Sequence, residues 1–182
     1  MRYWRGWGQS RLPPGADLAH LRRGLGRQPG SVAGIWPFYT ELTAAGWIGP
    51  RLRAEHIALG LFGLHQQSAR LLVHKSGIGL GAAARRLKRS GRYSEDAVDR
   101  RVVAAASAAT VETLAVHLRG LVQQLSVITQ PMDYDRLMED LVRWQAADGA
   151  GRVRRRWGGE YYAPTGPDET GDPSPRLESG EQ

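Results

Sequence analysis

Apolar side chains recur at helical spacing along most of the chain. The clearest stripe runs from Val111 to Ile128, where leucine, valine and isoleucine follow one another at steps of three and four residues, the spacing of one face of an α-helix. A second stripe, over about residues 53–75, predicts a long and deeply buried helix. No run that alternates apolar and polar residues is long enough for a sheet. The pattern therefore predicts an all-α fold, a compact multi-helix bundle of about seven to nine helices.

Residues that commonly begin helices agree with this pattern. Ser94, Thr110 and Asp133 each stand directly before an amphipathic segment and predict N-caps. By the same rule, Asp17 is expected to cap a short helix that runs through about Gly24. Further helices are expected at about residues 35–42, 82–88 and 152–162.

The chain is expected to have three parts. Residues 1–10, with two tryptophans among glycines, form an N-terminal arm that is either loose or packed as a strap on the body. Residues 11–163 form the helical bundle domain, in two loosely separable halves at about residues 11–92 and 93–163. Residues 164–182 are rich in proline, glycine, serine and acidic side chains. We expect this tail to be disordered, because it can bury too little apolar surface to offset the entropy of ordering.

The composition excludes several classes of protein. Hydrophobic residues make up 41% of the 182 residues, as in ordinary globular domains, and no apolar run approaches the roughly 18 residues of a membrane span. Cysteine is absent, which excludes disulfide frameworks, thiolate nucleophiles and zinc sites built on cysteine ligands. The first residues lack the apolar segment of a signal peptide. We therefore expect a cytoplasmic protein with no membrane partner.

Charge is distributed unevenly along the chain. Lysine and arginine together number 25 and the acidic residues 18, for a formal net charge of +7. The tail from residue 164 onward has five acidic side chains and one arginine, so residues 1–163 carry 24 basic and 13 acidic side chains, or +11. Arginines supply nearly all of these cations, and a planar guanidinium suits bidentate contact with phosphate. The imbalance indicates a polyanionic partner, with a merely solubilising surface as the alternative.

No pattern of residues indicates catalysis, a metal or a cofactor. No histidine lies three or four residues from another, the spacing that two metal ligands on one helix face require. Four carboxylates between residues 133 and 140 could hold Mg²⁺ in a nuclease. A helix cap, a first-turn position and pairing with Arg136 and Arg143 explain them better. The histidines are His20, His56, His65, His74 and His117, and the carboxylates are Asp133, Asp135, Glu139 and Asp140.

Basic clusters recur at predicted helix ends and loops across the whole body. This spacing suits a groove that follows a nucleic-acid backbone better than one recognition helix that reads bases. Trp47 and Trp157 each lie near an arginine and could stack on bases, although tryptophans in such positions more often belong to a core. The clusters are Arg22 with Arg23, Arg51 with Arg53, Arg85 to Arg92, Arg100 with Arg101, Arg119, and Arg152 with Arg154 to Arg156.

Three glycines, Gly77, Gly79 and Gly81, are spaced as in a phosphate-binding loop. Such loops follow a β-strand and lead into the N-terminus of a helix. Here a helix is expected to precede the glycines, so we interpret the segment as a mobile loop. It could still touch a backbone phosphate, since basic side chains follow from Arg85 onward.

Short motifs follow a defined order along residues 11–163. The first are Leu21-Arg22-Arg23, Trp36-Pro37-Phe38-Tyr39 and Gly46-Trp47-x-x-Pro50-Arg51. The next are Leu61-Phe62-x-Leu64-His65, Gly79-Leu80-Gly81 and Tyr93-Ser94-Glu95. The last are His117-Leu118-Arg119-Gly120-Leu121, Asp133-Tyr134-x-x-Leu137, Leu141-x-x-Trp144 and the arginine-rich run that closes with Trp157 to Tyr162. This ordered set, rather than any single motif, resembles the small subunit of the type I-E CRISPR surveillance complex Cascade, the CasB family.

The resemblance implies an all-helical, non-catalytic subunit without metal or cofactor that acts in antiviral defence. It would hold crRNA and the target and displaced DNA strands, beside other Cascade subunits and a second copy of itself. The family pattern places arginines that face the backbone at Arg22, Arg23, Arg51, Arg152, Arg154 and Arg155, and a helix match alone adds Arg119. Two features depart from the family: the helix after Gly81 begins with three alanines, and the C-terminal tail is acidic.

Two other functions remain open at this point. A helical transcription regulator would use residues 95–106 and 111–128 as a helix-turn-helix, although the second helix is strongly apolar on one side and offers only Arg119 to read bases. A small nuclease would use the carboxylates of residues 133–140 with Mg²⁺.

Overall fold

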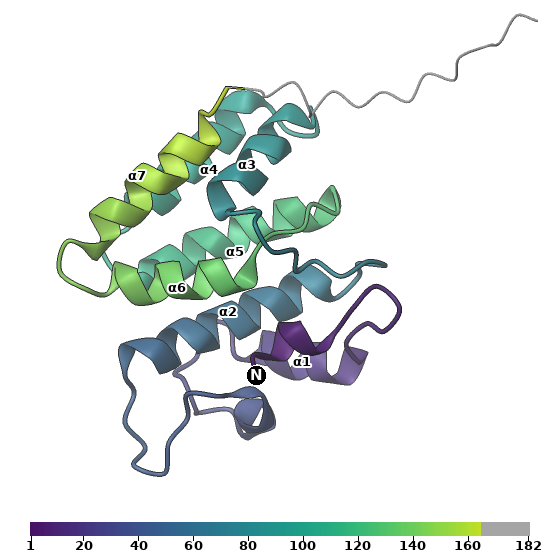
Figure 1. Ribbon diagram of the computed structural model, residues 1–182, viewed down its shortest axis with the longest axis vertical. Helices are drawn as coiled ribbons and strands as arrows, with labels where there is room; N and C mark the ends of the chain where they lie inside the picture. The colour runs from purple at the N-terminus through teal and green to yellow at the C-terminus, as the bar shows by residue number, and fades with distance from the viewer. Residues whose placement is uncertain (165–182) are drawn as a thin grey trace, which may run out of the picture.

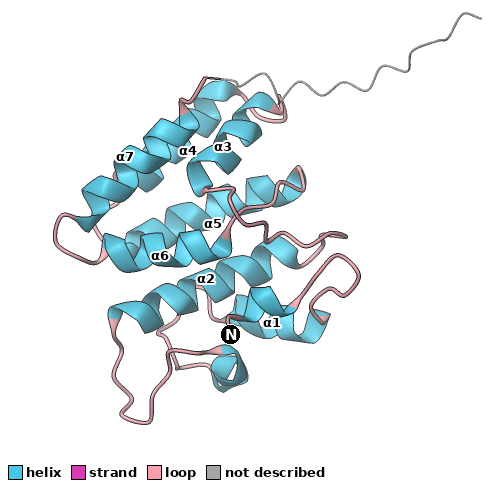
Figure 2. Cartoon of the chain, viewed as in Figure 1, coloured by secondary structure: helices cyan, strands magenta, loops and turns pink. Residues whose placement is uncertain are grey.

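The computed structural model describes residues 1–164, which form seven α-helices, two short 3-10 helices and no β-strand (Figures 1 and 2). The all-α prediction is confirmed. The predicted tail lies outside the described residues from residue 165 onward. None of the helices described has both the length and the hydropathy needed to span a bilayer. The elements are η1 Tyr3–Gly6, α1 Gly15–Arg23, η2 Ala33–Phe38, α2 Pro50–Gln66, α3 Leu80–Arg89, α4 Glu95–Ala106, α5 Val111–Val127, α6 Tyr134–Trp144 and α7 Gly149–Tyr161.

Helix α2 lies at the centre of the molecule. Every residue from Ala58 to Gln66 is buried, so this stretch has no face toward solvent. Helix α1 packs against α2 on one side, and α5 and α6 pack against it on the other (Figure 1). The approach of α1 is close, because a Cβ atom at Gly63 would lie only 2.7 Å from the Cβ of Leu21. The buried helix that the second hydrophobic stripe predicts is therefore α2.

The C-terminal helices build on α2 in two further layers. Helices α5 and α6 lie next to α2, and α3, α4 and α7 lie beyond them (Figure 1). The apolar stripe of α5 faces inward and is buried from Val111 to Leu125. Because α3 packs against α4 and α7, residues 80–89 belong with the C-terminal layers. The separability of two halves near residue 92 stays a prediction.

Most predicted helix starts are confirmed, with one correction. The side chains of Ser94, Thr110 and Asp133 each accept a hydrogen bond from a backbone N–H of the first turn. Helix α1, however, follows Pro14 and has no side-chain cap. Asp17 instead lies inside the helix, where its carboxylate accepts a 2.8 Å hydrogen bond from the hydroxyl of Tyr3. Its negative charge in the first turn still interacts favourably with the positive end of the helix dipole.

Helix α2 begins and ends earlier than the predicted range of 53–75. Pro50 occupies the first turn, where its fixed φ suits a helix and its missing N–H costs nothing. At the other end the side chain of Gln66 accepts a hydrogen bond from Val73 N–H and donates to Leu71 O. These bonds replace the helical ladder and turn the chain away, so Leu71 and Leu72 lie outside the helix. The helix expected at 35–42 is the 3-10 helix η2, with Pro37 inside it.

Two of the three glycines in the predicted mobile loop serve helix packing instead. Gly79 and Gly81 are both buried beneath α7. A Cβ atom at Gly81 would clash with the carbonyl oxygen of Trp157, and one at Gly79 would clash with the carboxylate of Glu160. The spacing of these glycines thus reflects the close contact of α3 with α7 and not a phosphate cradle. Only Gly77, with φ +85°, serves a turn.

The N-terminal arm is packed as a strap. Trp4 is fully buried, with its ring centroid 5.7 Å from that of Tyr134 and 6.1 Å from that of Phe62. Its indole N–H donates a 2.9 Å hydrogen bond to Asp135, which Arg5 also pairs with at 2.7 Å. The strap therefore ties the start of the chain to α2 and α6. Of the two alternatives for residues 1–10, the packed form is the correct one.

We predict that Trp4→Ala lowers the free energy of unfolding by about 3–5 kcal/mol, the usual cost of deleting a fully buried tryptophan. Trp47→Ala is the matched control, because the side chain of Trp47 is 71% exposed and its loss should change stability by no more than about 0.5 kcal/mol. Urea unfolding of the two variants measures both values. If both variants lose the same free energy of unfolding, the strap does not contribute to the fold.

Stability should also fall in mild acid because histidines are buried in neutral form. Burial lowers the pKa of His65 to about 4, whereas an unfolded chain binds a proton there near pH 6.5. The unfolded state therefore gains stability as pH falls from about 6.5 to about 4, and His65 alone accounts for a loss of about 3 kcal/mol at most. Unfolding curves of the wild type and His65→Gln across this range test the assignment. The variant should show the shallower fall, and parallel profiles would contradict it.

Candidate nucleic-acid interface

Three arginines from three different elements meet around one cavity. Arg27 comes from the loop after α1, Arg53 from the first turns of α2, and Arg119 from the middle of α5. The cavity has a volume of about 520 Å³ and lies where this loop, α2 and α5 come together. Its apolar walls are formed by Leu25, Pro29, Ile48, Ile57, Ala115 and Val116. The folded chain thus places cations at the edge of an apolar hollow.

A chain of hydrogen bonds holds the loop that carries Arg27. His56 Nε2 lies 2.9 Å from Gly24 O and 3.0 Å from Arg27 O, so this nitrogen must carry the proton and donate it. His56 Nδ1 then accepts from the hydroxyl of Tyr39 at 2.6 Å, and that hydroxyl accepts from Gly30 N–H at 3.2 Å. Burial lowers the pKa of His56, which keeps the ring in the neutral form that this network requires.

The positive surface continues along α5. A second hollow, of about 480 Å³, is lined by Arg100 and Arg101 of α4 and by His117 of α5. Val116 lines both hollows and therefore joins them. We call Arg27, Arg53, Arg100, Arg101 and Arg119 the basic band.

Acidic side chains neutralise little of this band. Within residues 1–164, Arg27, Arg100, Arg101 and Arg119 form no ion pair. Arg53 lies 3.8 Å from Glu112, and both side chains are largely exposed, so that pair is weak. A band of this kind attracts anions and can exchange its counterions for phosphate groups.

The predicted site residues Arg22 and Arg23 lie at the C-terminal end of α1, directly before the loop that carries Arg27. Arg23 is exposed and Arg22 is half-buried, and neither is ion-paired in the described part of the chain. Positive charge there is also favourable to the helix itself, since the last turn carries the negative end of the macrodipole.

Arg51, another predicted site residue, faces away from the cavity. Its guanidinium lies 3.0 Å from Glu41 and 4.0 Å from Glu139, on the side of α2 toward α6. Residues two apart on a helix lie about 200° apart around its axis, so Arg53 faces the cavity when Arg51 does not. The structure therefore brings Arg119 together with Arg53 and Arg27, and not with Arg51.

The predicted site residues of α7 form a separate group. Arg152 and Arg155 are exposed on the helix. Arg154 donates a 2.9 Å hydrogen bond to the carbonyl of Ala108, and its guanidinium lies 4.9 Å from the ring centroid of Trp144. Trp157, which could have stacked on bases, is buried against Trp144. Two arginines of this group are thus free to bind an anion, and the third holds helices together.

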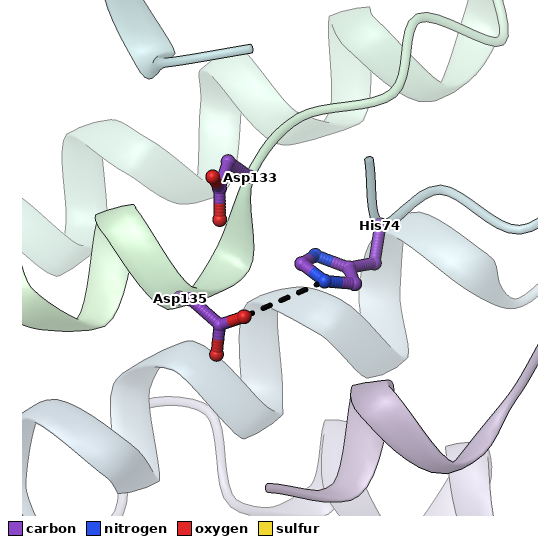
Figure 3. Close-up of side chains that lie close together, drawn as sticks. All are labelled: His74, Asp133 and Asp135. Atoms are coloured by element: carbon purple, nitrogen blue, oxygen red, sulfur yellow. Dashed lines mark ion pairs between the residues drawn. The ribbon is translucent and has the colours of Figure 1, made fainter. Parts of the chain in front are cut away.

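The carboxylates at the start of α6 act as structural anchors. His74, Asp133 and Asp135 lie close together (Figure 3), and each offers one ligand atom within 4.8 Å of those of the other two. Asp133, however, caps α6 and accepts from Gly77 N–H at 2.9 Å, and His74 Nδ1 accepts from Tyr134 N–H at 3.2 Å. Asp135 is half-buried, which opposes ionisation, but hydrogen bonds from Arg5, Trp4 and Arg2 hold its pKa below the usual range. Each group is therefore already engaged with the protein.

The prediction that the acidic side chains of α6 pair with arginines of the same helix is wrong. Glu139 pairs with Arg2 at 2.7 Å, and Arg136 pairs with Glu160 of α7. Asp140 is buried, accepts a 2.7 Å hydrogen bond from the indole of Trp157 and contacts Arg156. Tertiary partners thus replace the neighbours three and four residues away, because these acids face α7 and the strap.

Comparison of the chain with known proteins identifies one family. A family model described as CRISPR-associated protein Cse2 matches residues 17–162. The structure of CasB from Thermobifida fusca is 35% identical, with a TM-score of 0.67, and the match covers 82% of this chain and 85% of that chain. CasB from Thermus thermophilus is 26% identical, with a TM-score of 0.61 over 81% of this chain and 85% of that one.

A chain of a structure described as a CRISPR RNA-guided surveillance complex is 22% identical and shares the fold, with a TM-score of 0.65 over 82% of each chain. A search of curated proteins gives no match.

We predict that Arg154→Ala lowers the free energy of unfolding by about 1–2 kcal/mol, because the variant loses a charge-assisted hydrogen bond and the contact with Trp144. Arg152→Ala removes the same charge from another exposed position of the same helix, one without these two contacts, and should change stability by no more than about 0.5 kcal/mol. Thermal or urea unfolding compares the two. Equal stabilities would contradict a structural role for Arg154.

Proposed function

The chain belongs to the CRISPR-associated Cse2 family, also called CasB, and we propose that it is a non-catalytic nucleic-acid-binding subunit of a type I-E CRISPR surveillance complex. The family model spans most of the described residues, and a relative that is 35% identical has the same fold. The observation that carries the binding role is the basic band, in which arginines from four elements share one surface with little acidic compensation.

The proposed mechanism is electrostatic. Arginines fixed by folding displace counterions from a sugar-phosphate backbone, which gives affinity without sequence preference. Base pairing between guide RNA and target DNA supplies the specificity, and the protein favours the opened state by holding unpaired or hybrid strands. The proposed partners are therefore crRNA, the target and displaced DNA strands, other subunits of the complex and a second copy of this chain.

The predicted site residues divide by their surroundings. Arg119 lies within the basic band, and Arg22 and Arg23 extend it along the end of α1. Arg152 and Arg155 provide a second exposed group on α7. Arg51 and Arg154 already have protein partners, so they would have to exchange a carboxylate or a carbonyl for phosphate. We therefore assign the main contact to the band and secondary contacts to α1 and α7.

We predict that binding to single-stranded DNA weakens steeply with salt, by a log–log slope of about 0.7 for each phosphate contacted. The double variant Arg27→Ala/Arg119→Ala should lower affinity and flatten this slope by about 1.4, because two contacts are lost. Fluorescence anisotropy at several salt concentrations measures both quantities.

The control for this experiment is Arg70→Ala/Arg143→Ala, which removes the same charge. Arg70 follows the far end of α2, and Arg143 lies on α6 beside Glu139, so neither belongs to the band. Equal slopes for the two double variants would overturn the assignment of the surface. A sequence-specific footprint on duplex DNA would instead indicate a transcription regulator.

A further inference from the structure

We propose that the cavity between the α1–η2 loop, α2 and α5 accepts one unpaired base of the bound strand, while the arginines at its edge hold the neighbouring phosphates. This inference rests on the proposed function and adds to it a base-binding subsite. The band would then hold the strand in two ways, by charge along the backbone and by apolar contact with a base.

The size and lining of the cavity suit a nucleobase. Its volume of about 520 Å³ falls within the usual range for small-ligand sites. Ile48 lines it from the loop before α2, Ile57 lines it from α2 itself, and Ala115 and Val116 line it from α5. These side chains offer apolar surface for contact with a flat aromatic ring. Val116 is 70% exposed in the free protein, so an inserted base would cover apolar surface that is now in water.

The charges at the edge suit phosphate on either side of that base. Arg27 and Arg119 are both exposed and carry no ion pair with any described residue. With Arg53 they outnumber Glu112, the one acidic residue of the lining, by three to one. A base between two phosphates is complementary to this arrangement, because its apolar ring suits the cavity and the negative phosphates suit the positive edge.

The wall that carries Arg27 is preorganised. His56 and Tyr39 hold it through the hydrogen bonds to Gly24, Arg27 and Gly30. Gly24 itself leaves no room for a side chain, since a Cβ there would lie 2.5 Å from Ile35 and 2.9 Å from His56. A loop fixed in this way loses little further freedom on binding, so more of the contact energy appears as affinity.

The continuation of the band beyond the cavity favours a nucleic acid over an acidic peptide. Arg100 and Arg101 line the next hollow, which shares Val116 with the cavity. Cations repeated over two adjoining hollows match a chain that bears a charge on every unit. A duplex keeps its bases stacked inside and could not fill the cavity, so the occupant is an unpaired stretch.

The experiment compares a 12-nucleotide oligothymidine with a phosphate–deoxyribose chain of the same length that lacks all bases. An oligomer without any base is needed because a strand bound without sequence preference can slide past a single abasic position. The full-length wild type should bind the oligothymidine about 5- to 10-fold more tightly than the abasic chain, since apolar contact with a base contributes at the lower end of the range for stacking.

Two kinds of variant then separate the contribution of the base to affinity from that of the backbone. Ala115→Phe fills the cavity without changing charge and should bring the ratio of the two affinities close to one. Val116→Gln, at an exposed position that tolerates substitution, should lower this ratio as well. Arg119→Ala should weaken binding of both oligomers by the same factor and leave the ratio unchanged. The control is Ala109→Phe, an equal change at an exposed position outside the cavity.

Each outcome distinguishes this inference from the proposed function. If the wild type binds both oligomers with the same affinity, or if Ala115→Phe and Val116→Gln keep the full ratio, the base site is wrong and the backbone grip survives. A ratio of one in the wild type is also the result expected if the cavity is filled by an acidic peptide of a partner. If neither oligomer binds, the proposed function itself fails.

Discussion

The burial of α2 on all sides is the constraint on which the rest of the structure depends. A helix with nine consecutive buried residues needs a neighbour on every face, and here α1, α5, α6 and the N-terminal strap supply them. Burial of so much apolar surface is the dominant stabilising term in a domain of this size. The other helices can be understood as layers added around this one, with α3, α4 and α7 completing the cover of α5 and α6.

The same constraint produces the candidate site. Only the first turns of α2 reach solvent, and there Arg51 and Arg53 leave the helix in opposite directions. Because α1 must lie close to α2, the loop after α1 is carried to the edge of α5, where His56 fixes it. Arg27, Arg53 and Arg119, which are far apart in the sequence, meet as a consequence of packing the core. Within the described chain only Arg53 of these three has an acidic partner, and that pair is largely exposed, so most of this charge remains available for a partner.

Much of the fold follows from local sequence signals, and most of the site does not. The stripe of α5 and the caps at Ser94, Thr110 and Asp133 predict helices because periodicity and capping act within a few residues. The end of α2 could not be predicted, since it depends on hydrogen bonds that Gln66 makes to a turn beyond the helix. The sequence predicts Arg119 as a candidate site residue, but Arg27, which lines the same cavity, stands alone in a glycine-rich turn and belongs to no cluster. One signal was available for Arg53: its spacing of two from Arg51 already places the two side chains on opposite sides of a helix.

The central claim is that a nucleic-acid strand lies along the basic band. Hydrogen–deuterium exchange of the full chain, with and without a saturating single-stranded oligonucleotide, tests it most directly, because it locates the contact on the backbone without any substitution. Exchange should slow in residues 24–30 and in the first half of α5, and the strap and the first turns of α6 should not change. Slowed exchange confined to the strap and α6 would contradict the account.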